Sequence, residues 1–377
     1  MFVKGVGMTK FGIQEDATSH LVYEATFEAL DDADMSMNDI DAIVLSNNDI
    51  SSNGERQRHS ASMLSSLFQK KMPIIAVPSG CSGGGTALWT AVKLQKTSSY
   101  NTILVVGFEK MVSNISKKIT DEMLMGTERI YEQTEGMNFP AENALVAQQY
   151  MLMYDVTPDD FAFVSLKNHQ NAYLNPKARF YKKKISIEDI KNSPIVASPL
   201  RLFDCSIPAN GAASVILSRD KTDIEVIGFA DQSDYLSPFE REDMTTWDAT
   251  KLAAEEAYKQ AGITPDQIDV AEVHDAFTSV ELISYEDLGF CKKGEGKKLI
   301  RNGTTNLNGR MPVNTSGGLK AKGHPISATG ISQIYEIAKQ MRNEAGDRQV
   351  SDVKYALAQN IGGAGSTVTV HILKKVS

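Results

Sequence analysis

The sequence of 377 residues contains only three cysteines, Cys81, Cys205 and Cys291, and their spacing matches no common metal-binding motif. An odd number of widely separated cysteines is not typical of a disulfide-rich secreted domain or of a zinc site. We therefore expect free thiols in a reducing compartment and no bound metal.

Long apolar runs and an excess of positive charge are also missing. No uninterrupted apolar stretch is long enough to cross a bilayer, and the first residues resemble a strand rather than a signal peptide. The formal net charge of −8 disfavours nucleic acid as the main partner. We expect a cytoplasmic protein with no membrane or nucleic-acid partner, and the length is sufficient for two domains.

The most informative segment that is present surrounds Cys81. Residues 78–86 contain four glycines, follow the apolar, strand-like residues 74–77 and precede a helix-like run at 86–94. A sulfur at such a turn lies near a helix N-terminus, where the helix dipole and free amides favour a thiolate. The glycines are expected to leave room for a substrate. We predict that Cys81 is a catalytic nucleophile; the alternative is a buried structural cysteine.

An internal repeat indicates the architecture. Residues 28–41 align without a gap with residues 256–269, and each copy reads as an amphipathic helix, a turn, an Ile-Asp pair and an apolar strand. Helices that alternate with apolar strands predict an α/β fold with largely parallel sheets.

The repeat also predicts the domain organisation. We expect an N-terminal half at residues 1–220 and a C-terminal half at 221–377. A methionine-containing, polar insertion at about 110–201 would lie in the first half and either cap the active site or form an oligomer contact.

Two of the six histidines lie in turns of the second half. His324 lies in the glycine-rich residues 317–330, which correspond by the repeat to the Cys81 turn. His274 follows the apolar strand 270–273, at a strand end where ligands of α/β sheets bind. The glycine-rich residues 359–366 supply backbone amides for an oxyanion hole or, alternatively, form a tight hairpin turn.

Together these segments resemble the thiolase family, and their order matches along the whole chain. The likeness is greatest to the archaeal and sterol-carrier-type members, through the motifs at 316–325, 274–277, 167–172 and 199–205. The resemblance implies the thiolase fold, in which two pseudo-duplicated α/β halves form five layers, αβαβα, with an inserted loop domain.

The resemblance also implies roles for individual residues. Cys81 would be acylated by an acyl-CoA, His324 would activate its thiol, and His274 would hold the thioester oxygen as an enolate forms. The remaining predicted positions are backbone amides of an oxyanion hole, at Cys81, Gly362 and Gly363, and substrate-binding residues, at Ser316, Gly317, Asn360 and Phe277.

One departure from the family pattern concerns the second catalytic cysteine. Where many thiolases carry it near the C-terminus, this chain has Gln359 and Asn360, and the alternative position is Ala276. His274 or His324 would then have to abstract the proton, and we interpret Cys205 and Cys291 as structural.

The function that the resemblance implies is that of an acetyl-CoA C-acetyltransferase. It would condense two acetyl-CoA molecules by a ping-pong Claisen mechanism through acyl-Cys81, feed the mevalonate pathway, and need no cofactor beyond coenzyme A thioesters. The alternatives are a degradative 3-ketoacyl-CoA thiolase of longer or branched chains, a ketosynthase-like condensing enzyme, and a catalytically silent acyl-CoA-binding scaffold.

Partners follow from the same resemblance. We expect a homodimer or homotetramer. The archaeal likeness further implies a complex with 3-hydroxy-3-methylglutaryl-CoA synthase through a small OB-fold bridging protein.

Overall fold

The computed structural model describes residues 1–48, 55, 57–97, 99–112 and 116–376. Its main feature is a mixed nine-stranded sheet with the strand order β3-β2-β4-β7-β1-β8-β11-β10-β9. The first five strands belong to the N-terminal half and the last four to the C-terminal half. Strands β1 and β8 join the two half-sheets edge to edge, where Phe2 pairs with Glu225.

The two halves follow a similar order of elements, as the internal repeat predicted, but among the described residues the second half has one strand fewer and one helix more. The first half contains β1 (Phe2–Met8), α1 (Thr18–Ala33), β2 (Ala42–Ser46), α2 (Ser60–Phe68), β3 (Ile74–Ala76), α3 (Gly83–Lys96), β4 (Thr102–Glu109) and β7 (Gly211–Ser218). The second contains β8 (Ile224–Ser233), α8 (Asp248–Ala261), β9 (Val270–Glu272), α9 (Thr278–Asp287), α10 (Gly296–Arg301), α11 (Thr329–Met341), β10 (Tyr355–Gly362) and β11 (Thr367–Lys375).

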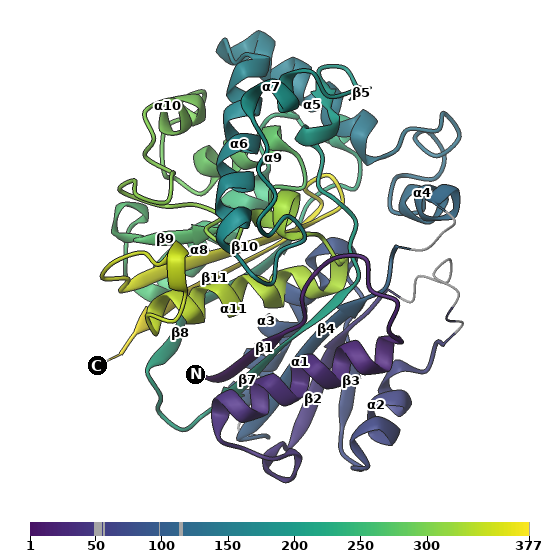
Figure 1. Cartoon of the computed structure of the whole chain (residues 1–377), viewed down its shortest axis with the longest axis vertical. Helices are drawn as coiled ribbons and strands as arrows, with labels where there is room; N and C mark the ends of the chain where they lie inside the picture. Colours follow the sequence, from purple (N-terminus) through teal and green to yellow (C-terminus); the bar gives the residue numbers. More distant parts are fainter. Residues whose placement is uncertain (49–54, 56, 98, 113–115, 377) are drawn as a thin grey trace.

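These elements stack in five layers, which confirms the predicted αβαβα architecture. Helix α1 packs on β1 and β7, α8 packs on β8 and β11, and α3 and α11 lie between the half-sheets (Figure 1). Apolar side chains of α3 and α11 share one buried core with strands of both halves. The central helices are therefore covered on two sides.

The expectation of largely parallel sheets is wrong. Among the strands of the described residues, only β2–β3, β2–β4 and β9–β10 pair in parallel, whereas β7 and β11 are antiparallel to both of their neighbours. The cause lies in the connections, because β11 returns from β10 through a tight turn and no crossover helix separates them. The glycine-rich residues after Gln359 thus form the hairpin alternative, with Asn360 inside β10.

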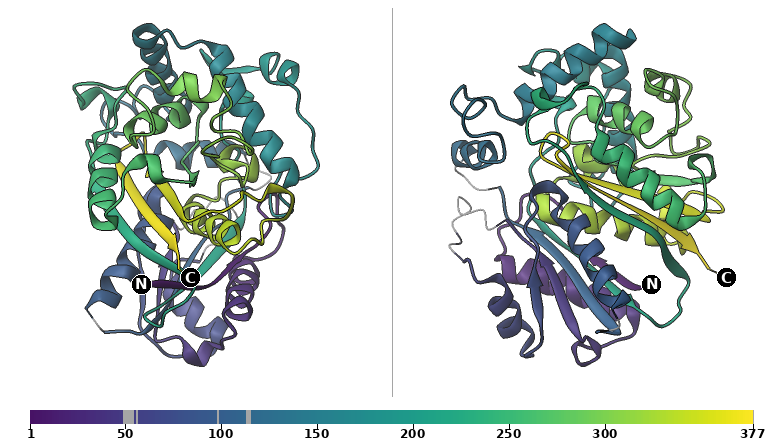
Figure 2. Two further views of the ribbon diagram at one scale, coloured as in Figure 1. Left: turned by 90° about the vertical axis from the view of Figure 1, so that its left-hand side faces the viewer. Right: turned by 180° about the vertical axis from the view of Figure 1, so that it is seen from behind.

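Between β4 and β7 the chain forms a mostly helical segment at one end of the molecule (Figure 2). Its elements are α4 (Ser116–Leu124), α5 (Phe139–Tyr154), α6 (Pro158–Leu174), α7 (Ile187–Lys191), β5 (Ile195–Ala197) and β6 (Leu200–Arg201). Helices α5 and α6 contact α9 of the second half, so the segment covers the end of the sheet at which the central helices begin.

Candidate active site

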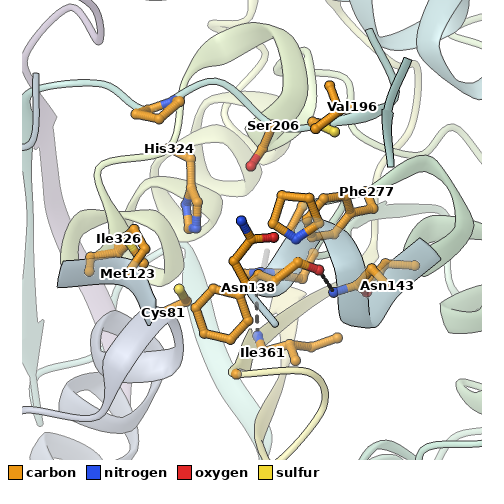
Figure 3. Close-up of a pocket in the computed structure, with 18 of the residues that line it drawn as sticks. Cys81, Met123, Asn138, Asn143, Val196, Ser206, Phe277, His324, Ile326 and Ile361 are labelled. Carbon is orange, nitrogen blue, oxygen red and sulfur yellow. Dashed lines mark hydrogen bonds between the residues drawn. The ribbon is translucent and has the colours of Figure 1, made fainter. Parts of the chain in front are cut away.

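A cavity of about 340 Å³ opens where α3 and α11 begin, and it brings together the three predicted catalytic side chains. Cys81, His274 and His324 all line it. Figure 3 shows the His324 ring pointing toward Cys81. Most other lining residues are apolar: Met111, Ile119, Met123, Phe139, Val196, Trp247, Phe277, Val280, Ile326 and Ile361.

The glycines that follow Cys81 allow the two central helices to approach each other. A Cβ at Gly84 would lie 2.8 Å from the Ser327 carbonyl oxygen, and one at Gly330 would lie 2.3 Å from the Gly85 nitrogen. Such distances exclude any side chain. Here the glycines serve close helix packing rather than the predicted access of substrate, and this packing brings the Cys81 and His324 turns together.

Cys81 lies in a short 3₁₀ turn, Gly80–Ser82, between β3 and α3, as the sequence predicted. Its thiol, however, is not poised as a thiolate. Burial, together with the nearby Glu109 carboxylate, raises the pKa of Cys81 to about 12. The expectation of a lowered pKa is therefore wrong, since loss of solvent around the sulfur outweighs the helix dipole. Cys81 needs a base to release its proton.

His324 is held in the form that can act as this base. Its Nδ1 lies 2.7 Å from the Thr329 hydroxyl, and that hydroxyl donates its own proton to the Pro325 carbonyl at 3.2 Å. Nδ1 must therefore carry the hydrogen and donate it to Thr329, which leaves the lone pair on Nε2. Burial lowers the pKa of His324 to about 3, so the ring is neutral at rest.

His274 is held in the opposite tautomer. Its Nδ1 accepts hydrogen bonds from the Ile361 amide and from the Asn360 side chain, both at 3.2 Å. The hydrogen is consequently on Nε2, which makes this nitrogen a donor. Burial and the neighbouring His324 lower the pKa of His274, so the ring is a neutral donor. The two imidazoles lie edge to face with centroids 5.4 Å apart.

The predicted oxyanion-hole residues lie beside the sulfur. Gly363 lines the cavity and has a positive φ of 61° at the β10–β11 turn. A Cβ at Gly362 would meet the Ser82 hydroxyl oxygen at 2.9 Å, so this strand end packs directly on the Cys81 turn. The amides of Cys81 and Gly363 thus come from two adjoining turns.

Of the four predicted substrate-binding residues, the structure brings only Phe277 to the cavity. The buried Asn360 lies behind the wall, where its amide also donates to the Cys81 carbonyl at 2.9 Å and accepts from the Gly85 amide at 3.1 Å. Ser316 binds the buried Glu272 carboxylate, and Gly317 packs on Ala172. These three positions shape the site from behind.

Asp275 ties the two histidine loops together. Its carboxylate accepts from the Leu319 amide at 2.6 Å and from the Asn168 side chain at 2.7 Å. Gly318, at a φ of 61°, is required because any Cβ would lie 2.3 Å from this carboxylate. The residue after His274 therefore fixes the loop that leads to His324.

Comparison with known proteins identifies this arrangement. Residues 1–203 match the model of the thiolase N-terminal domain, and residues 230–375 match the thiolase C-terminal domain-like model. The chain belongs to the thiolase family. The motif order predicted from the sequence agrees with this membership.

Individual relatives support the expected subgroup of thiolases. The acetyl-CoA acetyltransferase of Methanothermobacter thermautotrophicus is 37% identical, with 99% of each chain covered. Sterol carrier protein 2 of Bos taurus is 34% identical, over 98% of this chain and 71% of that protein. Among solved structures, a chain of the Ltp2-ChsH2(DUF35) aldolase superposes with a TM-score of 0.84 at 26% identity, covering 99% of this thiolase and 97% of that chain.

Sequence reasoning missed several residues that line the cavity of this thiolase. Cys205 and Ser206 lie on the wall, and Figure 3 shows Ser206 beside His324 and Phe277. Trp247 and Asn138 also contribute, from segments with no recognisable motif. For Cys205 a signal existed, since it is one of only three cysteines and ends a motif that resembles the family.

Metal binding and membrane insertion find no support in the described part of this thiolase. Among those residues, no three His, Cys, Asp or Glu side chains are grouped as a metal ion would require. Nor does any helix within the described ranges combine the length and apolarity needed to span a bilayer.

Proposed function

We propose that this thiolase is an acetyl-CoA C-acetyltransferase that works through an acyl-Cys81 intermediate. The observation that carries the proposal is the pair of complementary histidines around one buried thiol. Nε2 of His324 is free to take a proton, and Nε2 of His274 is free to donate a hydrogen bond. Acyl transfer needs one of each: a base for the nucleophile and a donor for the thioester oxygen.

The first half-reaction uses the buried thiol. His324 takes the proton of Cys81, and the sulfur attacks the carbonyl carbon of an acyl-CoA. The amides of Cys81 and Gly363 stabilise the oxyanion, and coenzyme A leaves as a thiol with the proton that His324 returns. Because both partners are neutral at rest, the proton moves only as the new bond forms, which keeps Cys81 unreactive toward other electrophiles.

The second half-reaction uses His274. A second acetyl-CoA loses a proton from its methyl group, and Nε2–H of His274 stabilises the enolate oxygen. The carbanion then attacks acyl-Cys81 to give acetoacetyl-CoA. Loss of such a donor typically slows a reaction by about 10²–10³-fold. His274 itself is a poor base for the methyl proton, since both of its nitrogens are committed in this tautomer.

The proposal extends to the cellular role. The archaeal relative is named an acetyl-CoA acetyltransferase, which supports the reaction; the condensing direction and supply of the mevalonate pathway are part of the proposal. A cytoplasmic location, a homodimer or homotetramer, and halves at 1–220 and 221–377 belong to the same proposal. So does a complex with 3-hydroxy-3-methylglutaryl-CoA synthase through an OB-fold protein; the neighbour that contains a DUF35 component supports a bridging partner.

A coupled assay of acetoacetyl-CoA consumption with and without coenzyme A tests the proposal. We expect CoA-dependent loss in the native chain, no activity in Cys81→Ala, and full activity in the control Cys291→Ser. Cys291 suits this control because it packs against the second-half core away from the cavity. A well-folded native chain that leaves acetoacetyl-CoA unchanged would contradict the proposal and favour the silent scaffold.

Longer acyl chains are the second candidate substrates, because the cavity wall is mainly apolar. Trp247, Phe277 and Val280 line the wall beyond the catalytic side chains. If kcat/KM with 3-ketohexanoyl-CoA exceeds that with acetoacetyl-CoA, the degradative alternative replaces the biosynthetic one.

A further inference from the structure

A second thiol lines the same cavity as Cys81. Cys205 follows the turn Leu202–Asp204, and it forms a β-bridge with Phe277, three residues after His274. The next amide, of Ser206, donates to the Ala276 carbonyl at 2.7 Å, and the Ile207 carbonyl accepts from the His324 amide at 3.0 Å. The segment that begins at Cys205 is thus hydrogen-bonded to both histidine loops.

A buried lysine interacts electrostatically with this thiol. Lys320 is 1% exposed, and its Nζ has no hydrogen-bond partner among the described residues. The charge of Lys320 interacts with four nearby acidic groups, those of Asp204, Asp275, Glu281 and Cys205. Burial lowers the pKa of Lys320, and these acidic groups act in the opposite direction. In its ammonium form the side chain favours a thiolate at Cys205.

At rest Cys205 carries its proton. Sγ donates to the Arg201 carbonyl at 3.4 Å, and burial raises the pKa of Cys205 to about 11, although the Lys320 charge acts in the lowering direction. The protonated thiol is therefore an acid at neutral pH, and its conjugate base is a strong one.

Neither histidine is available to transfer the proton at Cα of the second acetyl group. His274 is committed as a donor, and His324 holds the proton that Cys81 released. We propose that Cys205 is the acid and base for the carbon atom, giving and taking the proton at Cα of the second acetyl group. This proposal rests on the thiolase reaction proposed above.

In the thiolysis direction, Cys81 acts as the nucleophile and Cys205 as the acid for the carbon atom. Cys81, its proton passed to His324, attacks the keto carbon of acetoacetyl-CoA, and the Cα–Cβ bond breaks with its electron pair on Cα. Cys205 gives its proton to Cα, so that acetyl-CoA leaves and a thiolate remains. The proton that His324 took from Cys81 then passes to the Cys205 thiolate. His324 next takes the thiol proton of coenzyme A as its sulfur attacks acetyl-Cys81, and returns that proton to the Cys81 sulfur as it leaves. Condensation is the reverse sequence.

Two reactions of the same enzyme separate this role from acyl transfer. Exchange of labelled coenzyme A with acetyl-CoA needs only acylation of Cys81, whereas thiolysis and condensation also need the proton at Cα. The variant is Cys205→Ser, which keeps the side-chain size and replaces the thiol by a much weaker acid. The matched control is Cys291→Ser, which changes a half-buried thiol outside the cavity.

We expect Cys205→Ser to lower thiolysis and condensation by about 10²–10⁴-fold, the usual contribution of a general acid, while CoA exchange stays within about threefold of the wild type. Deuterium exchange from solvent into the methyl group of acetyl-CoA should fall in parallel with thiolysis. Retained CoA exchange also certifies that the variant is folded. The control should leave all three rates unchanged.

Other outcomes overturn the assignment. Thiolysis close to the wild-type rate in Cys205→Ser would mean that His324, and not Cys205, transfers the proton at Cα. An equal loss of thiolysis and CoA exchange would assign Cys205 a structural role. A wild-type protein that exchanges no CoA would overturn the proposed function together with this assignment.

Discussion

Two histidines that lie 5.4 Å apart behave differently because of what binds their inner nitrogens. Thr329, which has already donated its proton, makes His324 a base toward the cavity. Asn360 and the Ile361 amide, both donors, make His274 a donor toward the cavity. At the residue scale, the tautomers and not the histidines themselves define the chemistry of the site.

The neutral resting state of Cys81 predicts a particular pH dependence of alkylation. Because burial and Glu109 raise the thiol pKa to about 12, the reactive thiolate fraction grows about tenfold per pH unit throughout the range from pH 7 to 10. The rate of iodoacetamide labelling, followed by peptide mapping, should rise without a plateau in this range. A plateau below pH 8 would mean that the helix dipole stabilises a thiolate after all.

A substitution that replaces the side-chain NH2 of Asn360 by an oxygen should invert the tautomer of His274. Asn360→Asp replaces the donor beside Nδ1 by a carboxylate, so the hydrogen should move to Nδ1, or the ring should become protonated. We expect kcat to fall by about 10²–10³-fold and the pH profile of kcat/KM to gain an ionisation near neutrality. Asn343→Asp, the same change at an exposed turn, is the control and should have no effect. An unaltered pH profile in Asn360→Asp would contradict the assigned tautomer.

At the scale of elements, helix α5 covers the cavity and carries Glu142, a buried carboxyl group next to Glu132 of the preceding turn. Glu142 is 2% exposed, and burial together with the adjacent Glu132 raises its pKa to about 8. Phe139, in the first turn of the same helix, lines the cavity. The charge state of Glu142 therefore affects the stability of an element of the site.

The raised pKa of Glu142 makes the folded state less stable as the pH rises. The folded protein retains the proton of Glu142 up to about pH 8, whereas an unfolded chain loses it near pH 4.5, so the folded state loses relative stability as the pH rises between these values. Glu142→Gln removes the ionisation. Urea unfolding should show the variant gaining stability relative to the wild type from pH 5 to pH 8. A difference that is constant with pH would exclude a raised pKa.

At the scale of the whole molecule, Arg342 links the two halves. It follows α11 of the second half and bonds Asp32 of α1 at 2.6 Å and Asp223, between β7 and β8, at 3.0 Å. The short β1–β8 pairing lies nearby, since the same guanidinium also donates to the Lys4 carbonyl at 3.2 Å.

Removal of this link should destabilise the protein globally. We expect Arg342→Met to lower the free energy of unfolding by about 2 kcal/mol, because the charged hydrogen bonds to Asp32 and to the partly exposed Asp223 are lost, while Asp32 keeps Lys339 at 3.1 Å. Lys251→Met is the matched control, as it breaks an exposed pair with Asp248 and should cost about 0.5 kcal/mol or less. Equal effects of the two variants in urea unfolding would show that the halves are not joined through Arg342.

The order of elements could be predicted from the sequence because the repeat consists of local patterns: apolar strands, amphipathic helices and glycine-rich turns. The strand directions could be predicted only in part: the β10–β11 hairpin follows from a glycine-rich turn, whereas the antiparallel position of β7 depends on pairing with the distant β1 and β4. The same holds for the site. Cys81, His274 and His324 lie in conspicuous turns, whereas Cys205 reaches the cavity through a bridge to Phe277 that no local pattern encodes.

Burial was the other property that the sequence did not reveal. The glycines after Cys81 appeared to make room for a substrate, but they admit a second helix. Asn360 appeared to face the substrate, but it holds His274 and the Cys81 carbonyl from behind. The fall in solvent access that results also reverses the expected pKa shift of Cys81.

The most direct test of this account is to trap the covalent intermediate. The native chain and Cys81→Ala are incubated with acetyl-CoA, quenched in acid, digested and mapped by mass spectrometry. The account predicts one acetyl group on the peptide that contains Cys81, lost on addition of coenzyme A and absent from the variant. An unmodified Cys81 peptide, or turnover of acetoacetyl-CoA by Cys81→Ala, would contradict it.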